Sequence, residues 1–210
     1  MLTQITPKDE RNIKKFTKII NKGPFKCLND KDCSNPQSDY IVNSSGKKHK
    51  NIYACAVAQA WLDVCRSVKV NDSNRSKIRN TQDKMANMLA KYFEEKPKDR
   101  KAFDAWYDST LSNATINTPL TVGQAQKIIN MSFKYLMCCS DLRENKLAHF
   151  SWCHMPLDKY TLEWLGLDGL VWSKIKDREL YFVLADYARS KVGEENVLLK
   201  EFEIWQKHIG

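Results

Sequence analysis

The sequence is poor in glycine and proline and has no long apolar run, and each shortage excludes a class of protein. With 7 glycines and 6 prolines in 210 residues, and no internal repeat, solenoid and propeller architectures are poorly supported. No apolar stretch approaches the roughly 18 residues of a membrane span, and the first residues lack the apolar segment of a signal peptide. The 7 cysteines are odd in number and lack the pattern of a disulfide framework. We therefore expect a cytoplasmic protein with no membrane partner.

Positive charge is abundant and unevenly distributed. The chain has 34 basic and 25 acidic side chains, a net charge of +9. Residues 1–100 hold 21 basic and 11 acidic side chains, whereas residues 101–210 hold 13 and 14. This excess fits a polyanionic partner, although a lysine-rich face exposed to water explains it equally well. With 42% hydrophobic residues, the chain can bury a core.

Helical periodicity dominates the chain. Thr6-Pro7 is typical of a helix start, and Gly23-Pro24 of a helix end. Apolar residues recur at helical spacing in further segments, and we expect helices over about 52–68, 76–95, 103–111, 121–139, 156–165, 177–191 and 194–208. Residues 25–50 are polar and irregular, with a short strand at 39–42. The pattern predicts one all-α domain over the whole chain, without an internal linker.

Two constellations of cysteine and histidine carry weak signals. One could bind zinc through thiolate and imidazole ligands, and it comprises Cys27, Cys33, His49 and Cys55. Its spacing lacks the Cys-x2-Cys pair typical of zinc sites, so we predict no metal, although zinc binding by these residues stays open. The other could supply a thiolate nucleophile, at Cys153-His154 or Cys138-Cys139. Because adjacent side chains rarely point at each other, structural cysteines are the better interpretation.

Two basic clusters in the first half combine long cations with short hydroxyl and amide donors. One follows Ser44-Ser45-Gly46 and comprises Lys47, Lys48 and Lys50. The other lies beside Ser73-Asn74 and comprises Arg75, Lys77 and Arg79. This mixture of donors is typical of contacts to phosphate groups. We predict that both clusters contact a nucleic-acid backbone; a solvated charged face is the alternative.

The most specific chemistry is predicted for Lys127 and Asp158. Lys127 lies near the start of an amphipathic helix beside Ile128 and Ile129, where the helix dipole and apolar neighbours favour the neutral, nucleophilic amine. Asp158 lies at the start of the helix expected after Pro156, a position that stabilises an ionised carboxylate. Such a pair can cleave an N-glycosidic bond, because the amine can attack C1′ while the carboxylate accepts a proton or stabilises the oxocarbenium-like sugar. The alternative is an exposed helix lysine and a capping aspartate.

Two motifs within residues 120–165 resemble a known family. Gly123 precedes Gln126-Lys127, and the Asp of Pro156-Leu157-Asp158 follows Lys127 by 31 residues. Together these motifs resemble the helix-hairpin-helix DNA glycosylase superfamily, and most closely its archaeal 8-oxoguanine DNA glycosylase branch. In that superfamily a hairpin leads into a helix with the catalytic lysine, and a Pro-x-Asp supplies the catalytic aspartate. Of the two hairpin glycines only Gly123 is present, and no four-cysteine iron–sulfur loop is visible.

The resemblance implies an all-α fold of two helical subdomains around a cleft. Residues 1–112 would be the basic helical part, and residues 113–210 would contain the hairpin, Lys127 and Asp158. The hairpin at Gly123 would grip phosphates through backbone N–H groups, and the substrate base would be flipped into the cleft. The partner would be double-stranded DNA, bound by a nucleoid-associated monomer that needs no cofactor.

Several side chains near this pair are candidates for contacting the flipped base. Stacking would come from Trp152, Trp172, Trp61 or Phe150, unless these rings are core. Trp152 is favoured because it lies six residues from Asp158. Polar contacts would come from His154, which could instead orient the loop, and from Gln124, Gln126 and Asn130. Lys134, seven residues after Lys127, is the second candidate nucleophile.

These features favour a DNA N-glycosylase, with or without abasic-site lyase activity, that excises a damaged or modified base. A non-catalytic nucleic-acid-binding protein and a helical protein-interaction module stay open as alternatives. The sequence also leaves open which base is excised, and whether the role is repair or action on modified foreign DNA.

Overall fold

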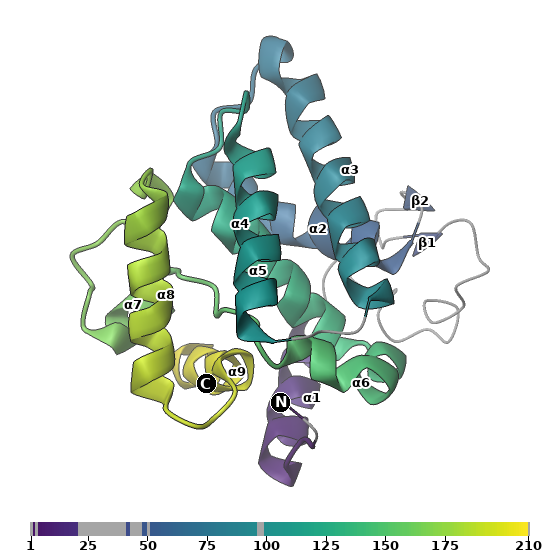
Figure 1. The fold of residues 1–210 in the computed structure, drawn as a ribbon, viewed down its shortest axis with the longest axis vertical. Helices are drawn as coiled ribbons and strands as arrows, with labels where there is room; N and C mark the ends of the chain where they lie inside the picture. The colour runs from purple at the N-terminus through teal and green to yellow at the C-terminus, as the bar shows by residue number, and fades with distance from the viewer. Residues whose placement is uncertain are drawn as a thin grey trace.

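The computed structural model describes residue 2 and residues 4–20, 41–42, 48–49, 51–95 and 99–209. Within them the chain is predominantly helical (Figure 1), which confirms the predicted all-α class. The α-helices are α1 (Pro7–Ile20), α2 (Ile52–Val64), α3 (Asp72–Glu94), α4 (Arg100–Thr115), α5 (Val122–Cys138), α6 (Ser140–Lys146), α7 (Lys159–Leu165), α8 (Arg178–Val192) and α9 (Val197–Ile209). Short 3-10 helices are η3 (Cys65–Ser67), η4 (Leu147–Phe150) and η5 (Trp172–Lys174). Two short strands, β1 (Ile41–Val42) and β2 (Lys48–His49), pair antiparallel.

The helix starts are set by side-chain caps. α3 begins four residues before its predicted start, because Asn71 and Asn74 each accept a hydrogen bond from the other's backbone N–H. α7 begins at Lys159 rather than at Pro156, because Asp158 has an extended backbone and caps the helix. Both differences between predicted and observed helix starts arise from capping side chains, and hydrophobic periodicity gives no information on these.

α5 is the central helix of the fold. It packs against α1, α2, α4, α6 and α8, and in Figure 1 it lies in the middle of the molecule behind α4. Every residue of α5 is buried except Lys127. A helix that is buried on all sides needs partners on all sides, and the surrounding helices supply them. Lys127 is the exception, so α5 approaches the surface at this residue.

α1 and α9 close one end of the core. They pack against each other at the lower end of the molecule in Figure 1. Lys8 Nζ of α1 lies 2.8 Å from Glu203 Oε2 of α9, and the Gln206 side chain donates a hydrogen bond to the Asn12 carbonyl at 2.9 Å. The two helices therefore fix each other against α5. Among the described residues, no helix is long and apolar enough to cross a lipid bilayer.

Candidate active site

The fold brings Lys127 and Asp158 together. Lys127 Nζ lies 3.3 Å from Asp158 Oδ2, and the two side chains are 13% and 11% exposed. Lys127 extends from α5, whereas Asp158 precedes α7, so two separate elements meet at this pair. The two side chains predicted to act together are thus in contact and partly buried.

Asp158 uses its two oxygens for different purposes. Oδ1 accepts hydrogen bonds from the backbone N–H groups of Tyr160 and Thr161, at 3.0 and 3.2 Å. Oδ2 faces Lys127. Asp158 therefore caps α7 and also pairs with Lys127. The hydrogen bonds of the cap fix the direction in which Oδ2 points.

Buried amides hold the Met155–Asp158 segment against α5. The Gln126 side chain donates to the Leu157 carbonyl at 2.8 Å and accepts from the Leu157 N–H at 3.2 Å. Asn130 donates to the Met155 carbonyl at 3.1 Å. Both amides are fully buried, so the structure supports a positioning role for them instead of the predicted contact with a base edge.

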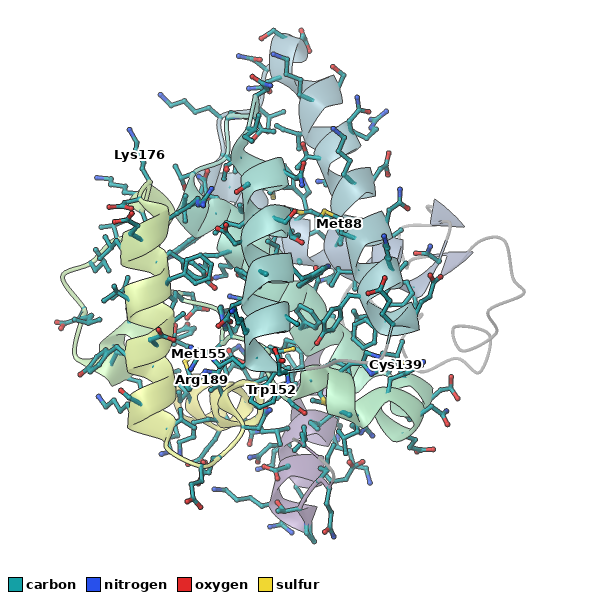
Figure 2. The ribbon with its side chains drawn as sticks, in the orientation of Figure 1. Met88, Cys139, Trp152, Met155, Lys176 and Arg189 are labelled. Atoms are coloured by element: carbon teal, nitrogen blue, oxygen red, sulfur yellow. The ribbon has the colours of Figure 1, made fainter. Side chains whose placement is uncertain are left out.

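Trp172 is the predicted aromatic residue whose ring contacts the pair. Lys127 Nζ lies 4.7 Å from the centre of the Trp172 ring, a cation–π contact. Trp152, which the sequence favours, is half-buried beside α8: its carbonyl accepts a hydrogen bond from Arg189 at 2.9 Å, and Figure 2 shows it close to Arg189. Phe150 is fully buried, and Trp61 packs against the core.

His154 belongs to a buried hydrogen-bond network. Its Nδ1 lies 2.8 Å from the Tyr181 hydroxyl, and its Nε2 lies 3.4 Å from Asp104 Oδ1. Tyr181 in turn donates to the Tyr107 hydroxyl at 2.7 Å. Burial lowers the pKa of His154, opposed by its contact with Asp104. These contacts favour the loop-orienting interpretation of His154 over a pocket donor.

The start of α5 differs from the predicted phosphate grip. The Gly123 N–H donates to the Ile175 carbonyl at 2.9 Å, so it is not available to a phosphate. The Gln124 side chain accepts from the Thr121 N–H and donates to the Ser67 carbonyl at 2.6 Å. The phosphate contact predicted for Gly123 would require this hydrogen bond to break, and it stays a prediction. Gln124 is likewise a capping and tethering residue, and it is buried.

Lys134 is not placed to act as a nucleophile. It is fully buried, with Nζ 2.5 Å from Glu201 Oε2 of α9. The ring centres of three aromatic residues lie 4.1 to 5.1 Å from Nζ, and they belong to Phe16, Phe202 and Trp205. This lysine cannot reach a substrate without displacing α1 or α9, so Lys127 is the nucleophile candidate that the structure supports.

Two carboxylates near the pair were not predicted. Asp63 Oδ2 of α2 accepts a hydrogen bond from the Tyr135 hydroxyl at 2.8 Å. Burial raises the pKa of Asp63, opposed by Tyr135 and by the positive charge of Lys127. Burial also raises the pKa of Glu201, with Lys134 opposing this shift and Asp158 adding to it. Both could have been found from the sequence, because Asp63 is the one charge of an apolar helix and Glu201 shares a helix face with Leu198 and Trp205.

The predicted backbone-binding cations are only partly described. Arg75, Lys77 and Arg79 are exposed on α3, and Arg75 lies 3.4 Å from Asp72. Lys47, Lys50 and the side chain of Lys48 lie outside the described residues, as do Cys27, Cys33 and the side chain of His49. The backbone contacts predicted for these cations therefore stay predictions, and zinc binding by the cysteines and His49, which the sequence does not favour, stays open.

The cysteines of the second half are packed into the core. Cys138, Cys139 and Cys153 are buried, and burial raises the pKa of the Cys138 thiol to about 12. Burial raises the pKa of Cys153 as well. These thiols are held in the unreactive protonated form, as the structural interpretation predicts.

The predicted cleft also stays a prediction. One surface pocket of the described part lies between α1 and α6, and another lies at the N-terminal ends of α5 and α8. Neither is lined by Lys127 or Asp158. Comparison with known proteins adds no assignment: no family model, no curated protein and no solved structure matches the chain.

Proposed function

We propose that the protein is a DNA N-glycosylase in which Lys127 is the nucleophile and Asp158 is the proton acceptor. One observation carries the proposal: the single incompletely buried residue of the central helix is a lysine, and its Nζ lies 3.3 Å from a carboxylate oxygen. The resemblance of the two motifs to helix-hairpin-helix DNA glycosylases supports the same pair.

The pair can carry out base release with a covalent intermediate. Asp158 Oδ2 takes the proton that the Lys127 ammonium must lose, and the Nζ lone pair then forms a bond to C1′ of the sugar. The C1′–N bond breaks, its electrons pass to the base, and Asp158 returns the proton to the departing base. Nζ then loses a second proton. The C1′–O4′ bond opens, O4′ takes up a proton, and C1′ and Nζ form a Schiff base. Because the Asp158 cap fixes Oδ1, Oδ2 keeps its direction through these steps.

In this proposal, access of a nucleotide to Lys127 involves a movement of Trp172. The lysine is 13% exposed, and the Trp172 ring covers its ammonium. Movement of this ring would expose Nζ to a flipped nucleotide. In its new position the ring can stack on the base, as aromatic side chains do in base-flipping enzymes.

The test is covalent trapping on DNA. The protein is incubated with duplexes that carry a panel of damaged or modified bases, with and without borohydride, and base release and cross-linking are measured. We expect one substrate to give both base release and a cross-link. Lys127→Gln should abolish the cross-link, and Asp158→Asn should lower base release by at least about a hundredfold. Lys191→Gln is the matched control, because Lys191 also lies over a tryptophan ring, 5.0 Å from the centre of Trp164.

The outcomes separate the candidate functions. Full activity of both Lys127→Gln and Asp158→Asn would show that the site assignment is wrong. Salt-sensitive DNA binding without base release on any substrate would favour a non-catalytic nucleic-acid-binding protein. Absence of DNA binding at low salt would favour a protein-interaction module.

A further inference from the structure

Two short segments beside the start of α5 carry cations without acidic partners. Arg66 lies in η3 and Lys69 just after it, whereas Lys174 ends η5 and Lys176 follows it. All four residues are exposed, and none forms an ion pair with another described residue. Arg178, two residues beyond Lys176, differs because it lies 3.0 Å from Asp108. Among the described residues, no acidic side chain therefore competes with an external partner for these four cations.

Both segments are fastened to the first turn of α5. The Gln124 side chain donates to the Ser67 carbonyl at 2.6 Å, which attaches η3. The Thr121 hydroxyl donates to the Ser173 carbonyl at 2.9 Å, and the Gly123 N–H donates to the Ile175 carbonyl at 2.9 Å, which attaches η5. Backbone atoms adjacent to the cations are thus held in place, although the cationic side chains extend into solvent.

The fastened segments also border the candidate active site. Trp172, the first residue of η5, covers the Lys127 ammonium, and Asp63 of α2 lies three residues before Arg66. Lys176 in addition lines the pocket of about 460 Å³ at the N-terminal ends of α5 and α8. Figure 2 shows Lys176 extending away from the protein. Cations from η3 and η5 therefore flank the first turn of α5, the turn that precedes Lys127.

We infer that Arg66, Lys69, Lys174 and Lys176 form a clamp for the phosphates on both sides of the nucleotide at Lys127. The inference rests on the proposed function and names the surface that holds the DNA strand. Because the Gly123 N–H is occupied by Ile175, the side chains of η3 and η5 take over the backbone contacts that a hairpin would make.

A clamp of charged side chains has a characteristic salt dependence. Each phosphate that a lysine or arginine neutralises releases counterions and contributes about −0.9 to the slope of log K against log salt concentration. A backbone N–H neutralises no charge and contributes far less. Removal of two clamp cations should therefore reduce the magnitude of the slope by about 2.

The experiment measures binding of the full chain to a duplex with a stable abasic-site analogue, at several salt concentrations. The variants are Lys174→Ala/Lys176→Ala and Arg66→Ala/Lys69→Ala. Lys15→Ala/Lys18→Ala in α1 is the matched control, since both lysines are exposed and form no ion pair with described residues. We expect each clamp variant to reduce the slope by about 2 and the control by less than about 0.5.

Equal slopes for wild type and clamp variants would overturn the inference. If the slopes are equal while Lys127-dependent base release persists, the clamp is wrong and the glycosylase proposal stands. If the clamp variants lower the slope while no base is released from any substrate, the clamp stands and the glycosylase proposal fails.

Discussion

Replacement of Gly123 by alanine tests how α5 and η5 fit together. A Cβ at this position would lie 1.7 Å from the Trp172 carbonyl oxygen and 3.3 Å from Ile175 Cβ. The first contact is with backbone, so no side-chain rotation relieves it. Either η5 or the first turn of α5 must move by more than about 1 Å before the contact becomes tolerable.

The cost combines three contributions. Overpacking at a backbone contact costs about 1–3 kcal/mol, and loss of the hydrogen bond from the Gly123 N–H to Ile175 costs about 1 kcal/mol. Alanine gains up to about 1 kcal/mol over glycine inside a helix. We therefore expect Gly123→Ala to lose roughly 1–3 kcal/mol of unfolding free energy, and its Tm to fall by roughly 2–12 °C.

Denaturant unfolding and borohydride trapping together check this prediction. Gly169→Ala is the matched control, because nothing lies within 4 Å of a Cβ built there, and it should stay within about 0.5 kcal/mol of wild type. Movement of η5 also shifts Trp172, so Gly123→Ala should trap less DNA even where it is fully folded. A Gly123→Ala protein as stable as the Gly169→Ala protein would refute the close approach.

Three further predictions concern the site and its surroundings. Asp158→Asn should keep the cap of α7 and lose only activity, whereas Asp158→Ala should also lose about 1 kcal/mol of unfolding free energy, measured by denaturant titration. Lys134→Met and Glu201→Leu should each cost about 3–5 kcal/mol because one buried charge is left alone, and the double variant should unfold at a higher denaturant concentration than either. Because burial lowers the folded-state pKa of His154 below 6.5, the unfolded state takes up the proton first as the pH falls. Unfolding free energy should then decrease below pH 6.5 by up to about 1.4 kcal/mol per pH unit, and His154→Gln should show a flatter dependence.

The sequence predicted the pair better than its surroundings. Lys127 and Asp158 each lie near a helix start, and helix starts have local signals in capping residues. The partner of Gly123 is Ile175, 52 positions away, and no local pattern connects them. The sequence therefore contained no indication that the Gly123 N–H is hydrogen-bonded within the protein.

Sequence distance also misled the choice of aromatic residue. Trp152 lies close to Asp158 along the chain, but the segment between them runs along α5 and carries Trp152 to Arg189. Trp172 is farther along the chain and is brought to Lys127 by the attachment of η5. The prediction for Lys134 was limited in the same way. Its spacing from Lys127 places both residues on one helix face, but α1 and α9 cover Lys134.

The burial of α5 on all sides has a consequence for synthesis of the chain. α1, α2 and α4 are made before α5, but α8 and α9 follow it, and α9 begins roughly 60 residues after α5 ends. At about 5–20 residues per second the ribosome needs several seconds for that stretch. During this time Lys134 lacks its ion-pair partner Glu201, and part of the apolar surface of α5 is not yet covered by later helices. In this interval the nascent chain therefore leaves uncovered the part of the apolar surface of α5 that α8 and α9 cover in the folded protein.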